Sequence, residues 1–349
     1  MDMAGAQSAS KVGLPSPSGV FSLDSGNTYT KASFGRETWK FPSYIKELDP
    51  DVDEFDLSRL PAGSAVVQLG DRMYAVGEIA EADGSPAFLL GKEHIAHILF
   101  YAALSPIIEQ QSHPTLKELR FLVPDARQRQ IESTWGAVAK RLQGTTDVVI
   151  NGKRVRPRVD NVRFISEGRP VFEWLKSTGR LSQWLENDSI TDVALVDVGG
   201  GDTTLAVVDL RTGQLDYQRG LVMSDLGVKA LAAAIATKIK PVCHGNPKTS
   251  DILKSLHHGD PAKYIYLSNV DHVNFEPHYK RAARSWREQI AHRILESGVM
   301  SARLGGCIFF GGGANHCVPF RSAIKNLDVR VLIDDMDSQL INVVAMQGM

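Results

Sequence analysis

The sequence predicts an α/β protein built from two similar α/β domains. Two stretches, residues 20–34 and 193–209, share one order: an apolar strand that ends on an aspartate, a turn of small and hydroxyl residues, and a second strand. Two apolar runs joined by a short turn of this kind are typical of a β-hairpin. Each hairpin opens a block of predicted strands that is followed by helices. The sequence therefore indicates an internal duplication of architecture.

The length and composition are those of an ordinary globular protein. The chain has 349 residues, of which 43% are hydrophobic and 23% charged, enough for two domains of typical size. The formal net charge of −1 provides no overall basic field, so we expect no direct contact with nucleic acid. The three cysteines, Cys243, Cys307 and Cys317, form no CxxC pair, which favours buried thiols in a reducing cytoplasm. No apolar run approaches the length of a membrane span.

Periodicity and turn residues place the remaining elements. Residues 65–77 are expected to form a strand, a Gly-Asp turn and a strand, and Asn151 with Gly152 is typical of a type I′ turn between two strands. The acidic residues 41–61 are expected to be irregular. Helices are expected over residues 91–111, 125–143, 172–185, 227–240 and 279–297, with a last strand at 330–333 and a terminal helix at 338–346.

The second hairpin combines groups that bind phosphate and metal. Asp197 ends its first strand and precedes Gly199, Gly200 and Gly201, whose backbone N–H groups can approach an anion without interference from Cβ. Thr203 adds a hydroxyl donor. A carboxylate at this position suits a hydrated Mg²⁺, which prefers oxygen ligands. On its own, however, a glycine triplet is explained more simply as a tight turn with an exposed aspartate.

Two further turns repeat this chemistry. After Asp24 come small and hydroxyl residues and then Lys31, whose ammonium group is able to reach a phosphate. Much later, an apolar run ends on Gly311, Gly312 and Gly313, where the absence of side chains would let an adenine ring lie against the backbone. Three such turns in this order are far more specific than any one of them.

Together, the two aspartate hairpins and the late glycine turn resemble the phosphate-one, phosphate-two and adenosine motifs of the actin/heat-shock-chaperone/sugar-kinase ATPase superfamily. The resemblance extends over residues 20–349. It implies an actin-like fold, in which two duplicated α/β domains of the ribonuclease-H-like kind flank a nucleotide cleft. The short spacing between the three motifs is similar to that of the ParM/StbA group of bacterial actin-like proteins.

The resemblance also implies a division of the chain. Residues 1–19, which are rich in Ser, Gly, Pro and Ala, are expected to form a flexible tail. Actin-like domain I is expected over residues 20–185, with a small-subdomain insertion at about 36–90 that is similar to the one in this group. Actin-like domain II is expected over residues 186–349.

The resemblance assigns roles to individual residues. Asp24 and Asp197 correspond to the two catalytic aspartates that hold the metal and the phosphates. The residues that would bind the nucleotide lie in the three turns: Ser25, Gly26, Asn27, Thr28, Lys31, Gly199, Gly200, Gly201, Asp202, Thr203, Gly311, Gly312, Gly313 and Ala314. Glu167 lies in a segment similar to the one that carries the hydrolytic residue, and it is the candidate that orients or deprotonates the attacking water. The family usually has proline before this glutamate, whereas this chain has Ser166, and a solvated loop carboxylate is the alternative interpretation.

These features imply a nucleotide-dependent ATPase that assembles head to tail into actin-like filaments and drives the segregation of plasmid or other DNA. The cofactors would be ATP, or GTP, and Mg²⁺, and a DNA-binding adaptor protein would join the filament to its cargo. A small-molecule kinase of the same superfamily is one alternative, which would need a substrate pocket near the γ-phosphate. A chaperone-like ATPase is another, which would need an appended substrate-binding domain. The expected location is the cytoplasm.

Other polar clusters have simpler interpretations. The histidines show no paired spacing typical of zinc ligands, and His257 with His258 is expected to lie in an exposed loop. The acidic run of Asp334, Asp335 and Asp337 is expected to form a solvated turn rather than a metal site.

Overall fold

The structure is a computed structural model, and it describes residues 19–49, 51–53, 56–257, 259–301, 303–322, 328–333 and 338–349. The expected tail apart from its last residue, His258, and the acidic run at 334–337 lie outside the described residues. Contacts between residues divide the chain into two compact units, Met1–Val171 with Leu340–Met349, and Phe172–Gln339. The division expected from the sequence lay further along the chain, at residues 185 and 186.

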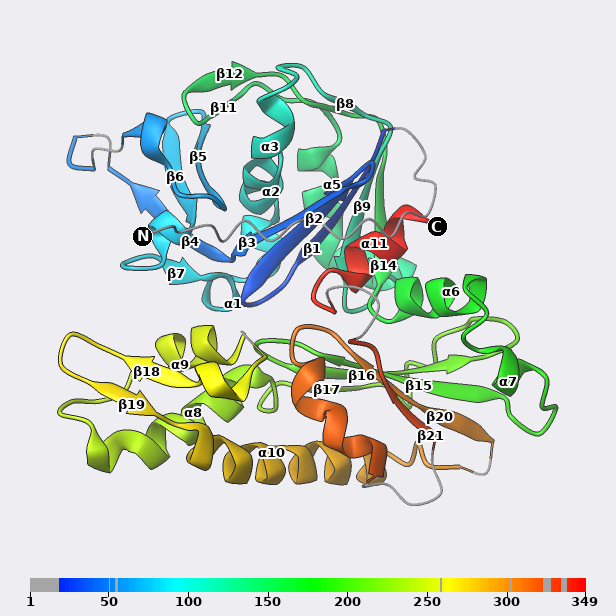
Figure 1. Ribbon diagram of the computed structural model, residues 1–349. Helices are drawn as coiled ribbons and strands as arrows, with labels where there is room; N and C mark the ends of the chain where they lie inside the picture. Colours follow the sequence, from blue (N-terminus) through cyan, green and yellow to red (C-terminus); the bar gives the residue numbers. More distant parts are fainter. Residues whose placement is uncertain are drawn as a thin grey trace. The chain divides into compact units, whose positions relative to one another are not determined.

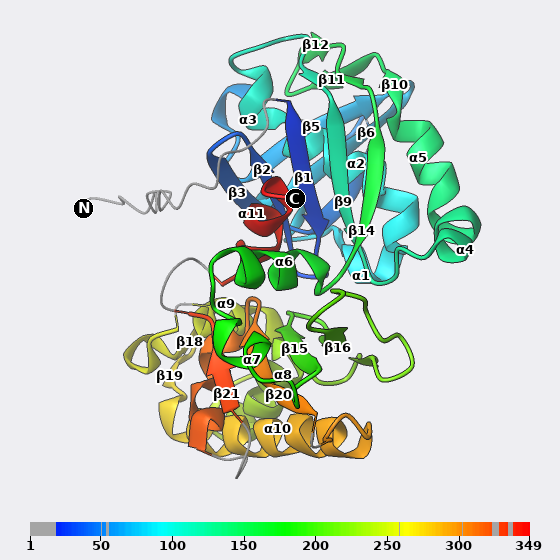
Figure 2. The same cartoon turned by 90° about the vertical axis from the view of Figure 1, so that its right-hand side faces the viewer.

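The first unit contains a five-stranded sheet that begins with the first aspartate hairpin (Figure 1). Its strands are β1 (Val20–Ser25), β2 (Tyr29–Phe34), β3 (Glu37–Pro42), β9 (Glu118–Val123) and β14 (Val162–Ser166), in the order β14-β9-β1-β2-β3. The strands β1, β2 and β3 form an antiparallel meander, whereas β9 and β14 run parallel to β1. Figure 2 shows β1, β9 and β14 side by side.

The first unit contains two further sheets. A six-stranded sheet has the order β12-β11-β5-β6-β4-β7, and a three-stranded sheet has the order β10-β13-β8. Their strands are β4 (Tyr44–Leu48), β5 (Ser64–Leu69), β6 (Arg72–Gly77), β7 (Ser85–Pro86), β8 (Thr115–Leu116), β10 (Gly144–Thr145), β11 (Val148–Ile150), β12 (Lys153–Val155) and β13 (Arg158–Val159).

Helix α2 (Lys92–Ala103) connects the two larger sheets of the first unit. It contacts β1 and β2 in one sheet and β5 and β6 in the other, and its buried side chains belong to a core shared with both. Leu99 and Phe100 are fully buried there, beside Phe21 of β1 and Val67 of β5. The other α-helices of this unit are α1 (Ala87–Leu90), α3 (Ser105–Ile108), α4 (Gln128–Gln130), α5 (Gly136–Leu142) and α11 (Ile341–Gln347), while α6 (Arg169–Ser177) spans the division between the units.

The second unit repeats the topology of the first five-stranded sheet. Its strands are β15 (Asp192–Val198), β16 (Thr203–Asp209), β17 (Leu221–Met223), β20 (Leu304–Phe310) and β21 (Asp328–Val331), in the order β17-β16-β15-β20-β21. Again the first three strands form an antiparallel meander, and the last two run parallel to the first. The shared order and directions confirm the predicted duplication.

The core of the second unit follows from the alternation of side chains along β15. Ala194, Val196 and Val198 point to one face, where they pack with the buried faces of α8 (Val228–Ile239) and α10 (Glu276–Glu296). The remaining α-helices and strands of this unit are α7 (Ser182–Leu185), α9 (Thr249–Leu256), β18 (Ile265–Leu267) and β19 (His272–Asn274).

Several expected elements are confirmed, and others were wrong in detail. Asn151 and Gly152 join β11 to β12 with positive φ angles of 50° and 76°, as a type I′ turn requires. Residues 41–61 were expected to be irregular, yet they contain the end of β3 and all of β4. The helix expected over 91–111 is interrupted before Pro106, and the one expected over 172–185 is divided into α6 and α7, with Gly179 at φ 71° between them.

The last helix, α11, packs on β1 and β2 of the first unit (Figure 1). The side-chain amide of the buried Gln347 lies within hydrogen-bond distance of the carbonyl oxygens of Val20 and Ser33, at 3.2 and 2.9 Å, and of the Ser22 hydroxyl at 3.1 Å. The guanidinium group of the buried Arg120 donates to the carbonyl oxygens of Met346 and Gln347. These polar contacts hold the end of the chain on the sheet that carries Asp24.

Replacing Gln347 with leucine should destabilise the first unit. The leucine fills a similar volume but leaves buried carbonyl oxygens without their donor, so we expect a loss of about 1–3 kcal/mol in the free energy of unfolding. Urea unfolding followed by circular dichroism measures the loss. Gln110→Leu, at an exposed position of the same unit, is the matched control. Equal unfolding midpoints for the two variants would contradict the role given to Gln347.

Candidate functional site

The first aspartate hairpin places a carboxylate and an ammonium group next to each other. Asp24 and Lys31 are cross-strand partners in the β1–β2 register, and Nζ of Lys31 donates to Oδ2 of Asp24 at 2.8 Å. Both side chains are largely buried, with 10% of Asp24 and 16% of Lys31 exposed. The pair closes the turn that contains Gly26, Asn27 and Thr28. The sequence-predicted members of this loop therefore lie together.

Ser43, which the sequence analysis missed, supports the same turn. It lies between β3 and β4, and its hydroxyl donates to the carbonyl oxygen of Gly26 at 2.7 Å. Its backbone N–H donates to the carbonyl oxygen of Thr28 at 2.9 Å. Because its one hydroxyl proton is used for Gly26, the hydroxyl of Thr30, 2.9 Å away, must be the donor between the two side chains. No local signal identifies Ser43, because the contact joins positions that are distant in the sequence.

Glu167 follows β14, which is parallel to β1 with β9 between them. The carboxyl ends of these strands lie at the same edge of the sheet, so Asp24 and Glu167 lie at one edge, two strand spacings or about 10 Å apart across the sheet. Glu167 is half-buried, and its backbone N–H donates to the carbonyl oxygen of Val123 at 2.8 Å. Ser166, which replaces the usual proline, accepts a hydrogen bond from the backbone N–H of Ala126 at 2.8 Å through its hydroxyl.

The second aspartate hairpin forms a loop that is bound to the start of helix α8. The backbone N–H groups of Val228 and Lys229 donate to the carbonyl oxygens of Gly199 and Gly200, at 3.0 and 2.8 Å. The hydroxyl of Thr203 donates to the carbonyl oxygen of Leu226 at 2.8 Å. The first N–H groups of a helix have no partner within the helix, and here the loop provides acceptors for two of them.

This arrangement fixes the direction of the loop N–H groups. In a trans peptide, the C=O of one residue and the N–H of the next point in opposite directions, and the described residues contain no cis peptide bond. Since the carbonyl groups of Gly199 and Gly200 point toward α8, the N–H groups of Gly200 and Gly201 point away from it. Two successive N–H groups on one side of a glycine loop are the donors that an anion such as a phosphate requires.

Gly311, the first residue of the third glycine turn, lies against the carboxylate of Asp197. Its φ angle is 91°, and a Cβ placed on it would lie 2.1 Å from Oδ1 of Asp197 and 2.9 Å from the carbonyl oxygen of Val198. Asp197 of β15 is level with Phe310 of the parallel strand β20, which brings the two segments together. The backbone N–H of Gly313 then donates to the carbonyl oxygen of Val198 at 2.8 Å. The third turn therefore packs directly against the end of the strand that leads into the second turn.

A buried histidine, His316, follows the third turn. Nδ1 of His316 lies 3.0 Å from the hydroxyl of Tyr279, and the carbonyl oxygen of His316 accepts from Arg287 at 2.9 Å. Burial, with His257 and Arg287 nearby, lowers the pKa of His316 to about 3. The imidazole is therefore neutral at physiological pH and acts as a packing and hydrogen-bonding group.

The candidate residues fall into two groups. Asp24, Lys31 and Glu167 belong to the first unit, and Asp197 with the two glycine turns belongs to the second. Neither group contains a preformed cage for a metal ion, because the described residues include no cluster of three or more His, Cys, Asp or Glu side chains able to hold one. Mg²⁺ does not require such a cage, since it usually keeps several waters and binds one or two carboxylates.

Comparisons with known proteins bear on the fold of the chain. Residues 22–169 match the family model described as the N-terminal domain of actin-like proteins. Similar solved structures include Alp7A, an actin-like protein, with a TM-score of 0.72 at 15% identity, covering 94% of each chain. The complex of Ta0583, an archaeal actin homolog, with ADP has a TM-score of 0.70 at 15% identity, covering 94% of this chain and 97% of that one. A ParM filament from Clostridium botulinum has a TM-score of 0.69 at 13% identity, covering 94% of this chain and 98% of that one.

The chain therefore has the predicted α/β fold of the actin-like class. The match of residues 22–169 to the actin-like N-terminal domain and the fold shared with Alp7A and ParM agree with the resemblance seen in the sequence. A comparison with curated proteins found no match. Across the described ranges, no helix is both long and apolar enough to cross a membrane.

Gly311→Ala should disrupt the second group of residues far more than Gly312→Ala. At Gly311 the new Cβ would collide with the Asp197 carboxylate in a strained backbone region, which costs roughly 1–3 kcal/mol or more in the free energy of unfolding. At Gly312 the nearest atom is Cγ of the flexible Gln339 side chain at 3.3 Å, so the cost should be small. Urea unfolding of both variants measures the difference. Equal stability would show that Gly311 does not pack against Asp197 as described.

Proposed function

We propose that the chain is a nucleotide-dependent ATPase that assembles into actin-like filaments. One observation carries the proposal: in each five-stranded sheet the first strand has an aspartate, Asp24 or Asp197, as its last residue but one, and a loop of small and hydroxyl residues follows that strand. The structural similarity to an archaeal actin homolog with bound ADP supports a nucleotide as the ligand. The similarity to filaments of ParM and Alp12 supports self-assembly.

In this proposal both loops bind one nucleotide with Mg²⁺. The N–H groups of Gly200 and Gly201 donate to phosphate oxygens, and Lys31 supplies a positive charge while it remains next to Asp24. Asp24 and Asp197 would hold the hydrated metal ion through their carboxylates. When bound, Mg²⁺ neutralises charge that develops on the phosphates. The adenosine part lies at Gly311–Ala314, and ATP is the expected nucleotide, with GTP as the competitor because a glycine turn does not specify the purine.

Glu167 is the proposed residue for hydrolysis. Its place at the sheet edge that carries Asp24 supports a role in positioning or deprotonating the attacking water. The alternative, a solvated loop carboxylate, predicts no effect on hydrolysis when the charge is removed.

We extend this proposal to a cellular role in DNA segregation. Head-to-tail contacts that do not close into a ring produce filaments, and hydrolysis would weaken them. A DNA-binding adaptor protein would connect the filament to plasmid or other DNA, in agreement with the formal net charge of −1 of the chain itself.

Asp197→Ala should abolish nucleotide-dependent assembly. Removing the carboxylate removes a metal ligand and the group against which Gly311 packs. Light scattering at 90° and pelleting, with Mg-ATP, Mg-GTP or no nucleotide, measure assembly and identify the preferred base. Asp188→Ala is the control, because its side chain is 97% exposed and pairs with Arg211 on the surface. A wild-type protein that hydrolyses ATP yet stays monomeric at all concentrations would refute the filament proposal and favour a kinase.

Glu167→Gln should separate hydrolysis from assembly. The amide keeps the shape of the side chain but cannot accept a proton, so release of phosphate should slow by about 10²–10⁴-fold. Binding of Mg-ATP and assembly should persist, and the filaments should disassemble more slowly. Phosphate release and scattering recorded on the same samples test this. Unchanged hydrolysis would assign Glu167 to the alternative, a solvated loop residue.

A further inference from the structure

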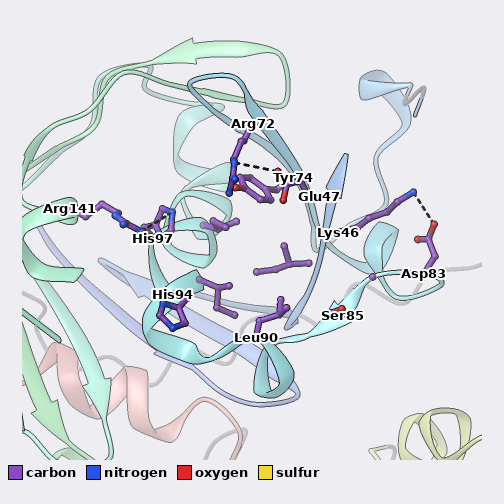
Figure 3. Close-up of a pocket in the computed structure, with 14 residues that line it drawn as sticks. Lys46, Glu47, Arg72, Tyr74, Asp83, Ser85, Leu90, His94, His97 and Arg141 are labelled. Atoms are coloured by element: carbon purple, nitrogen blue, oxygen red, sulfur yellow. Dashed lines mark hydrogen bonds and ion pairs between the residues drawn. The ribbon is translucent and has the colours of Figure 1, made fainter. Parts of the chain in front are cut away.

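The first unit contains a pocket that lies outside both groups of candidate residues (Figure 3). Its volume is about 500 Å³, within the range of about 300–1,000 Å³ that is typical of small-molecule sites. The walls come from β4, β6, the residues 83–85 and the helices α1, α2 and α5. None of the residues assigned to the nucleotide takes part.

Aliphatic side chains provide the apolar part of the pocket. Ile45 of β4, Leu90 at the end of α1, and Ile95 and Ile98 of α2 line it, and the three isoleucines are almost completely buried. Such a surface favours the apolar body of a ligand.

On one side of the pocket the cationic side chains have carboxylate partners, whereas on the other side Arg141 has none among the described residues. Lys46 lies 2.7 Å from Asp53 and 2.9 Å from Asp83, so its charge is compensated within the protein. Arg72 lies 3.5 Å from Glu47. Figure 3 shows Lys46 with Asp83 on one side of the pocket, and Arg141 with His97 on the opposite side.

Arg141 has a different environment from these cations. Its Nη1 lies 3.3 and 3.5 Å from the two ring nitrogens of His97, and no described carboxylate is within ion-pair distance of its guanidinium group. Burial and the charge of Arg141 lower the pKa of His97 to about 4, so at neutral pH the imidazole carries no charge. A guanidinium group presents a fixed fork of donors that suits carboxylates and phosphates.

We propose that this pocket binds a small organic anion, with its apolar body against Ile45, Ile95 and Ile98 and its carboxylate or phosphate group on Arg141. The apolar lining selects the body, and the uncompensated cation selects the charge. The site is independent of the proposed nucleotide site, because the two share no residues.

The test uses the full-length protein and isothermal titration with benzoate, phenyl phosphate and phenol as probes. Both anions should bind saturably and at least tenfold more tightly than phenol, and their ratio tells whether carboxylate or phosphate is preferred. Arg141→Gln should weaken anion binding at least tenfold. Lys140→Gln, which removes the same charge from a neighbouring exposed position of α5, should change it less than twofold.

A second readout localises the binding. In ¹H–¹³C spectra of the histidine rings, the His97 resonances should shift with bound benzoate, whereas those of His244 and His316 in the second unit should not. Anions that bind no more tightly than phenol, equal effects of the two substitutions, or an unchanged His97 resonance would each overturn the proposal. Because no nucleotide is present, the result does not depend on the proposed ATPase activity.

Discussion

The carboxyl ends of parallel strands lie at one edge of a sheet, and this constraint places most of the candidate residues. In the first unit, β1 carries Asp24 near its end, and the parallel strand β14 leads directly into Glu167. In the second unit, β15 carries Asp197 near its end, and the parallel strand β20 leads into Gly311. The same strand order in both units thus produces two groups with similar chemistry, each held by rigid strands rather than by long loops.

Close backbone packing then gives the second group its shape. A Cβ on Gly227 would lie 2.3 Å from the carbonyl carbon of Gly201, so the loop can approach the start of α8 only because this position is glycine. Gly311 allows a similar approach to Asp197 from the other side. The loop therefore packs against the start of α8, and its hydrogen bonds there set the direction of its N–H groups. In the first group, hydrogen bonds donated by Ser43 hold the turn after Asp24 in place.

Local patterns in the sequence were sufficient for much of this architecture. The two aspartate hairpins, the Asn151-Gly152 turn and the helices α8 and α10 each depend on residues that are close in the chain. Strand β4 was missed because Ile45 and Leu48 pack into different apolar clusters, which hides the alternation that marks a strand buried on one face.

Contacts between segments that are distant in the chain could not be predicted from the sequence. The directions of β9, β14, β20 and β21, the support of the first turn by Ser43, and the packing of α11 on β1 are all of this kind. Neither the pocket beside Arg141 nor the contact of Gly311 with Asp197 has a local signature.

The proposed function requires that Asp24 and Asp197 both contribute to the binding of one nucleotide with its metal ion. A double-mutant cycle on the affinity for Mg-ATP, measured by isothermal titration with Asp24→Ala, Asp197→Ala and the double variant, tests it most directly. If both carboxylates bind one metal ion, each single substitution should lower the affinity for Mg-ATP at least tenfold. The free-energy effects of the two substitutions should then be non-additive by about 0.5 kcal/mol or more. An unchanged affinity in either single variant, or fully additive effects, would contradict a shared site.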